Sequence, residues 1–218
     1  MLTDFGNFMS KIDHTFYINL DIREDRRLHV ENNVLPFIGI PMENISRFPA
    51  VDMTKESSRS RRGAGCSLSH LKCWEIAQKK KYDFIMMVED DFELVVSQQE
   101  FKETIDTLFS EMPNFNICNL GYNNVVPLIE INGKSFFRCQ QIQTTSCYIA
   151  RVEFLKKIQP VIKEATGRLL RNESYHNNAI DQIWKQFQSD EGWIVSKRLG
   201  RQKGTYSDIE KREINYGV

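Results

Sequence analysis

The sequence predicts an α/β fold, with a mostly parallel sheet flanked by helices and a late antiparallel hairpin. In the first half of the chain, short β-branched and aromatic runs alternate with amphipathic segments, and this order places parallel strands between helices. In the second half, an apolar run over 128–137 is interrupted by Asn132 and Gly133, which favour a two-residue hairpin turn. We find no repeat or linker, so we expect a single domain over 1–218.

Elements of the first half follow from apolar periodicity and from proline and glycine. We expect a strand over 14–20, a helix ending near 34, an edge strand over 47–51, a polar loop over 52–62, a helix over 67–80 and a strand over 83–88. Pro36 should end the first helix, and Pro49 marks an edge strand because it cannot donate a ladder hydrogen bond. Gly63, Ala64 and Gly65 are expected to open the second helix.

Elements of the second half are a mixture of helices and strands. We expect a helix over 101–112, a strand over 115–120, the hairpin, a strand over 144–150, helices over 152–163 and 177–187, and a short extended segment over 193–196. Residues 197–218 are polar and have little apolar surface to pack. We therefore expect a core over about 13–196 and a tail that runs over the surface.

Composition excludes several classes of protein. The 29 basic and 29 acidic residues give a net charge of zero, so nothing pulls the whole chain toward nucleic acid or an anionic membrane. No stretch approaches the roughly 20 apolar residues of a membrane span, and the start of the chain lacks a secretory pattern. Five cysteines without CxxC spacing indicate reduced core residues and not a zinc site. We expect a cytoplasmic location, or the host cytoplasm if the source is viral.

Three consecutive acids, Glu89, Asp90 and Asp91, follow directly on the predicted strand over 83–88. Adjacent carboxylates repel one another, and burying them is costly unless a cation offsets the charge. Hard oxygen ligands at the end of a strand suit Mg²⁺ or Mn²⁺ bound to a diphosphate. A charged loop after a buried strand is the alternative interpretation, and the acids alone leave both open.

Two further motifs carry candidate binding groups. Arg23 and Arg26 follow the first strand, where ligands of a doubly wound sheet collect, and a guanidinium there would pair with phosphate unless the segment is only a solvated helix start. The helix predicted after Gly65 would present free N–H groups to an anion, with Ser67 or Ser69 as its N-cap. His70 fits either a half-buried position beside an aromatic ring or a hydrogen-bonding position in a pocket.

Seven short segments occur in order along the chain: 16–20 with Arg23 and Arg26, then 47–52, 65–70, 89–91, 145–149, 180–181, and Gln202 with 207–209. In this order they resemble glycosyltransferase family 25, which includes lipooligosaccharide galactosyltransferases and collagen hydroxylysine galactosyltransferases. The resemblance covers residues 14–210, nearly the whole chain. The chain lacks the long extra regions of the collagen-modifying enzymes.

The resemblance implies a GT-A fold and an inverting, Mn²⁺-dependent (or Mg²⁺-dependent) transfer from a nucleotide sugar, UDP-galactose in the best-known members. It implies that Asp91 binds the metal, with Glu89 and Asp208 as further candidate ligands. Glu89 is expected near the ribose or the metal's waters, and Asp90 is an alternative ligand. The residues expected around the donor nucleotide are Asn19, Arg23, Arg26, Ser69, His70, Glu89, Asp90, Ser207 and Asp208. The tail that carries Ser207 and Asp208 is expected to close over the diphosphate.

The same resemblance implies that Asp181 is the general base of the transfer. One in-line displacement needs one such base near the hydroxyl group of the acceptor. We expect the acceptor to be a glycan or a glycosylated protein. Without the resemblance, Asp181 would be interpreted as an acid stabilised by the N-terminal dipole of its helix. Thr144, Thr145 and Tyr148 on the preceding strand are candidates to line the sugar pocket.

Two other functions compete with this interpretation. The first is a catalytically silent nucleotide- or carbohydrate-binding module of the same fold, which retention of the three acids and of Asp181 disfavours. The second is a nucleic-acid-binding protein that uses Arg59, Arg61 and Arg62, which the zero net charge disfavours. We therefore expect no nucleic-acid partner and no transmembrane segment.

Overall fold

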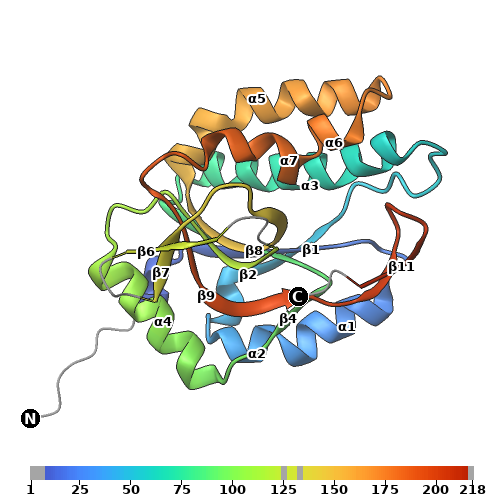
Figure 1. Ribbon diagram of the computed structural model, residues 1–218. Helices are drawn as coiled ribbons and strands as arrows, with labels where there is room; N and C mark the ends of the chain where they lie inside the picture. The colour runs from blue at the N-terminus through green and yellow to red at the C-terminus, as the bar shows by residue number, and fades with distance from the viewer. Residues whose placement is uncertain (1–7, 124–126, 132–134, 216–218) are drawn as a thin grey trace, which may run out of the picture.

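The computed structural model describes residues 8–123, 127–131 and 135–215, and it confirms the α/β class (Figure 1). Within these ranges the main sheet has nine strands in the order β2-β1-β3-β8-β5-β9-β7-β6, with β4 paired to β9. The strands are β1 (His14–Asn19), β2 (Ile45–Pro49), β3 (Phe84–Glu89), β4 (Phe92–Leu94), β5 (Ile117–Asn123), β6 (Ile129–Glu130), β7 (Phe136–Arg138), β8 (Gln143–Arg151) and β9 (Trp193–Gln202).

Strand directions bring several strand ends to one edge of the sheet. β1 pairs in parallel with β2 and β3, and β5 pairs in parallel with β9. β8, β7 and β4 run in the opposite direction to these strands. The carboxyl ends of β1, β2 and β3 therefore meet the amino end of β8, and a ligand site at this edge is expected for such a sheet.

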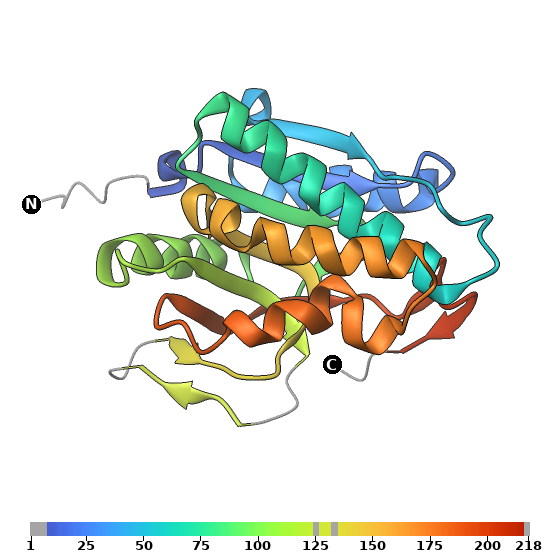
Figure 2. The same ribbon diagram turned by 90° about the horizontal axis from the view of Figure 1, so that it is seen from above.

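Helices cover both faces of the sheet. They are α1 (Glu24–Asn33), α2 (Leu35–Ile38), α3 (Arg59–Lys80), α4 (Gln98–Glu111), α5 (Val152–Leu170), α6 (Tyr175–Asn178) and α7 (Ile180–Ile183), with the 3₁₀ turns η1 (Phe8–Lys11), η2 (Met42–Asn44) and η3 (Trp184–Phe187). α3, α5, α6 and α7 lie on one face, and α1, α2 and α4 lie on the other (Figures 1 and 2). None of the helices in the described ranges combines the length and apolar character that crossing a bilayer requires.

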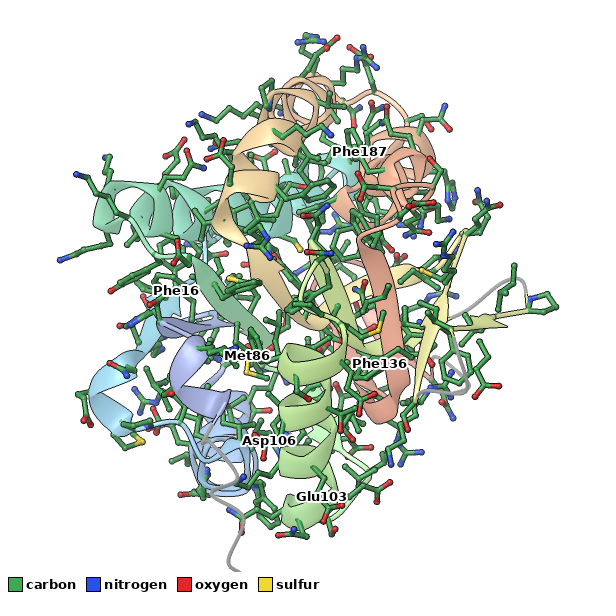
Figure 3. The ribbon with its side chains drawn as sticks, turned by 90° about the vertical axis from the view of Figure 1, so that its left-hand side faces the viewer. Phe16, Met86, Glu103, Asp106, Phe136 and Phe187 are labelled. Atoms are coloured by element: carbon green, nitrogen blue, oxygen red, sulfur yellow. The ribbon has the colours of Figure 1, made fainter. Side chains whose placement is uncertain are left out.

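The apolar core is divided by the sheet into two clusters. Phe16 belongs to the cluster under α3 and α5, whereas Met86 and Phe136 belong to the cluster against α1, α2 and α4 (Figure 3). On α4 the exposed Glu103 lies outside this second cluster. Alternate residues of a strand face opposite sides of the sheet, so a single strand contributes side chains to both clusters.

Helix α3 begins earlier than the sequence predicts. Ser58 is its N-cap, with an extended backbone and a hydroxyl that accepts from the N–H of Arg61. The expected polar loop over 52–62 is therefore wrong in its last part, because Arg59, Arg61 and Arg62 form the first turn of the helix.

The glycines of α3 consequently lie inside the helix and do not open it. Ser67 and Ser69 are interior residues, not N-caps, so the anion site expected at a helix start after Gly65 is also wrong. Gly63 and Gly65 serve close packing instead: a Cβ on Gly63 would lie 2.4 Å from the Tyr175 ring, and one on Gly65 would lie 2.6 Å from the backbone oxygen of Val51.

Other boundaries also differ from expectation. The first helix ends before Pro36 as expected, at Asn33, but helical structure resumes at once in α2. Pro36 occupies the first turn of α2, where its missing N–H costs nothing. α5 continues past 163 to Leu170 with Pro160 inside it. The single helix expected over 177–187 is three short pieces, α6, α7 and η3. The late hairpin is confirmed by the pairing of Ile129 with Arg138, although its turn at 132–134 lies outside the described residues.

The end of the chain contributes to the sheet. β9 does not stop at 196 but continues to Gln202, between β5 and β7 in the sheet order, and Leu199 is fully buried. The expectation that all residues after 196 run over the surface is therefore wrong. A separate hairpin follows, formed by β10 (Thr205–Ser207) and β11 (Arg212–Ile214). We call residues 205–214 the C-terminal hairpin.

Candidate active site

A cavity of about 140 Å³ opens at the sheet edge where β1 and β3 end. Nine of the eleven site residues predicted from the sequence line it: Asn19, Arg26, Ser69, His70, Glu89, Asp90, Asp91, Ser207 and Asp208. Apolar side chains of Ile18, Val51 and Met53 line the same cavity, which we call the first pocket. A pocket with both a charged side and an apolar side suits a nucleotide, whose phosphates and base need different surroundings.

Asp90 is held by protein groups on both of its oxygens. Asn19 donates to Oδ2 at 2.8 Å, and Arg26 donates to Oδ1 at 2.9 Å. Asn19 is itself fixed, because its Oδ1 accepts from Arg47 Nε at 3.1 Å. Burial raises the pKa of Asp90, and the Arg26 charge opposes that rise. The hydrogen bond between Asn19 and Asp90 therefore joins the ends of β1 and β3. No pattern in the sequence predicted that Arg47 fixes Asn19.

Asp91 is the acid with unused coordinating capacity. Its Oδ2 accepts from Gln202 Nε2 at 3.0 Å, and Arg26 lies 3.6 Å away. Its Oδ1 is buried and has no hydrogen-bond partner among the residues that the structure describes. Burial, with the nearby Glu89 charge, raises the pKa of Asp91 to about 7. A buried carboxylate oxygen without a partner is what a divalent cation would satisfy, so Asp91 fits the metal-binding role.

Glu89 faces away from this arrangement, toward α3. Its Oε1 lies 2.9 Å from His70 Nε2 and accepts from the Thr145 hydroxyl, with Cys66 Sγ at 3.8 Å. Burial alone would raise the pKa of Glu89, but the hydrogen bond and charge of His70, with the Thr145 hydrogen bond, lower it.

His70 is fully buried, not half-buried. Its Nδ1 lies 2.9 Å from the Tyr148 hydroxyl, which accepts from Trp74 Nε1 at 2.9 Å. The expected neighbour of His70, Trp74, is thus reached through Tyr148. Since both ring nitrogens are engaged, His70 acts on the pocket through Glu89.

Ser69 has a structural role at the wall of the first pocket. Its hydroxyl donates to the Gly65 carbonyl at 2.7 Å and accepts from the Val51 N–H at 2.9 Å. The side chain therefore joins α3 to the segment after β2.

Arginines of α1 and α3 hold the C-terminal hairpin over the first pocket. Arg26 donates to the Thr205 hydroxyl at 2.8 Å and to the Tyr206 carbonyl at 2.7 Å. Arg23 pairs with Asp208 at 2.7 Å, and Arg62 donates to the Ile209 carbonyl at 2.7 Å. Arg23 lies outside the lining of the first pocket and acts by fixing Asp208.

Asp181 lies in a second cavity of about 200 Å³, the second pocket. The two pockets share a wall made by Cys66, Glu89, Gln202, Ser207 and Ile209. Burial raises the pKa of Asp181, and hydrogen bonds from Gln182 and from the backbone N–H of Thr144 oppose the rise. A carboxyl group with a raised pKa in a pocket suits general base chemistry near neutral pH.

Thr144 has a strained backbone beside Asp181. Its φ is 72°, a left-handed value that is unfavourable for a β-branched residue. The Thr144 hydroxyl lies 3.2 Å from Gln202 Oε1, so the strained residue connects Asp181 with the residue that contacts Asp91. Such strain is typical of functional sites, and no local sequence pattern predicts it.

Comparisons with known proteins identify the family to which the chain belongs. The sequence pattern of glycosyltransferase family 25 (LPS biosynthesis protein) matches residues 12–201. This match covers most of the chain and defines a glycosyltransferase, an enzyme that moves a sugar from a donor to an acceptor. The chain belongs to glycosyltransferase family 25. None of the curated proteins compared with this sequence matches it.

One solved structure supports the fold. A glycosyltransferase involved in the glycosylation of the major capsid of PBCV-1 is 12% identical, with a TM-score of 0.53, over 91% of this chain and 95% of its own. Mannose-1-phosphate geranyltransferase from Thermus thermophilus is 11% identical over 91% of this chain and 59% of its own. Its TM-score is 0.39.

Proposed function

We propose that this enzyme transfers a hexose with inversion from a UDP-sugar, UDP-galactose in the first instance, to a hydroxyl of a glycan or glycosylated protein acceptor. The observation that carries the proposal is the pair of pockets with a shared wall, Asp91 in one and Asp181 in the other. An in-line displacement needs a leaving group on one side of the reacting carbon and a base on the other.

The first pocket would hold the donor. Ile18, Val51 and Met53 offer an apolar surface for the base, and Arg26 offers a cation whose present partners are Asp90 and the C-terminal hairpin. Asp91 would bind Mn²⁺ or Mg²⁺ through its unpartnered Oδ1, and Asp208 in the same pocket is the candidate for a further ligand. The metal would neutralise charge on the departing diphosphate.

The second pocket would hold the acceptor. Asp181 would take the proton of the attacking hydroxyl, while the Thr144 N–H and the Gln182 amide hold its carboxylate in place. The family's description as LPS biosynthesis protein suggests a bacterial surface glycan as one acceptor class, and the capsid enzyme suggests a glycosylated protein as another.

The experiment is a panel of nucleotide sugars, each tested for donor hydrolysis and for transfer in Mn²⁺ and in EDTA. We expect the wild-type protein to transfer sugar from UDP-galactose in Mn²⁺ and not in EDTA. We expect Asp181→Asn to bind UDP but not to transfer the sugar. The matched control is Asp190→Asn, because Asp190 pairs with Asn116 away from both pockets. UDP binding without turnover of any donor would instead favour the silent binding module.

A further inference from the structure

Three side chains that could ligate a metal ion, Cys66, His70 and Glu89, meet beside the wall that the two pockets share. Cys66 and His70 are one turn apart on α3, and Glu89 is the last residue of β3. Their ligand atoms all lie within 4.8 Å of one another. His70 Nε2 is 2.9 Å, and Cys66 Sγ is 3.8 Å, from the same Glu89 oxygen. These separations are close to those between ligands that share one ion with metal–ligand bonds of about 2.0–2.3 Å.

The chemistry of this set differs from that of Asp91. A thiolate, an imidazole and a carboxylate together suit Zn²⁺, whereas Mn²⁺ and Mg²⁺ prefer oxygen ligands alone. The spacing is not visible in the sequence as a zinc motif, because Glu89 lies 19 residues beyond His70 and is brought back by β3.

The groups around the three ligands are those that a metal site needs. In protein metal sites, a ligating histidine donates its other N–H to a fixed partner, which sets the tautomer. The Tyr148 hydroxyl lies 2.9 Å from His70 Nδ1 and is held by Trp74 Nε1 at 2.9 Å. The Thr145 hydroxyl donates to Glu89 and fixes that carboxylate in turn.

We propose that Cys66, His70 and Glu89 form a binding site for a thiophilic divalent cation such as Zn²⁺, separate from the site at Asp91. All three residues line the first pocket, and Cys66 and Glu89 also line the second, so an ion can reach them from the cavity. On binding, the Cys66 thiol releases its proton to solvent, and His70 Nε2 gives up the proton that it directs at Glu89. The ring proton that His70 keeps lies on Nδ1 and donates a hydrogen bond to the Tyr148 hydroxyl oxygen. The proposal concerns binding alone and holds whatever sugar the enzyme uses.

The test uses Co²⁺ as a spectroscopic substitute for Zn²⁺ on the full, chelator-treated chain. We expect a thiolate-to-cobalt charge-transfer band at one equivalent, its loss when Zn²⁺ is added, and a rise in Tm with Zn²⁺. Cys66→Ala should lose the band and the Tm rise. Cys73→Ala is the matched control, because Cys73 is buried on the same helix and is not a member of the cluster.

Two further variants separate this site from the one at Asp91. His70→Gln should weaken Co²⁺ binding at least tenfold, and Asp91→Asn should leave the band unchanged. The proposal is overturned if the wild-type protein shows no charge-transfer band with Co²⁺, or if Cys66→Ala keeps the band. Loss of the band in Asp91→Asn would assign the metal to the donor site and would also overturn it.

Discussion

At Gly65, helix α3 packs closely against the segment after β2, which forms part of the wall of the first pocket. A Cβ at this position would lie 2.6 Å from the Val51 carbonyl oxygen and 3.4 Å from Met53 Cβ. The first neighbour is backbone and cannot move aside by a rotamer change. Gly65→Ala must therefore displace α3 or the segment after β2, which Ser69 also joins to the helix.

The net effect is the difference between two opposing terms. Overpacking costs about 1–3 kcal/mol, while replacing a helix-interior glycine with alanine returns about 1 kcal/mol. We expect Gly65→Ala to lower the free energy of unfolding by about 0–2 kcal/mol. The matched control is Gly167→Ala on α5, where the nearest atom to the added Cβ is 3.5 Å away. That variant should gain about 0.5–1 kcal/mol, because propensity acts alone.

The assay is urea denaturation of both variants and the wild-type protein, with the slope m compared to confirm equal exposed surface. UDP affinity in Mn²⁺ should fall in Gly65→Ala and stay constant in Gly167→Ala. If the two alanine variants are equally stable, then α3 adjusts freely and the reasoning from close packing fails.

Three further predictions concern the charged groups. Asp91→Asn should abolish transfer and the Tm rise given by UDP with Mn²⁺, and full wild-type activity in EDTA would contradict a metal role. Asp181→Asn should keep UDP affinity but cut turnover by about 10²–10⁴. Burial raises the pKa of Asp181, so Asp181→Asn should be more stable than the wild-type protein at pH 8, where the wild-type carboxyl is charged. This gain in stability should shrink as the pH falls and the wild-type carboxyl is protonated. A gain that grows toward acid pH would be inconsistent with the raised pKa. Arg26→Gln should speed amide exchange over residues 205–214, because Arg26 donates to the Tyr206 carbonyl. Arg27→Gln is the control and should leave this exchange unchanged, because Arg27 pairs with Glu24 at the surface. Equal exchange rates in the two variants would show that Arg26 does not hold the hairpin.

Features that depend on local pattern were predictable from the sequence. The strand that ends in Glu89 was expected because an apolar run stops at three acids, and β2 was expected at an edge because of Pro49; both are confirmed. The gathering of nine predicted residues around one pocket followed from the resemblance to family 25 and from the common edge of parallel strands.

Features that depend on distant contacts were not predictable. The glycines of α3 indicated a helix start, but their neighbours are Tyr175 and Val51, which no local pattern reveals. The polar residues after Lys197 indicated a surface segment, yet β9 continues because β4 and β5 supply its hydrogen-bonding partners. In both places tertiary contacts override the local preference of the sequence, through close packing at α3 and through strand pairing at β9.

The place of β9 in the sheet has a consequence for how the chain matures during synthesis. β9 is made last among the strands of the main sheet but pairs with both β5 and β7. Until it emerges from the ribosome, β5 is an uncovered edge, and such edges promote pairing between chains. The first pocket needs Asn19 and Arg26 from one end of the chain and Gln202 and Asp208 from the other. A nascent or prematurely terminated chain therefore exposes the edge of β5 and lacks an assembled first pocket, because β9 and the C-terminal hairpin supply both the cover for that edge and the last residues of the pocket.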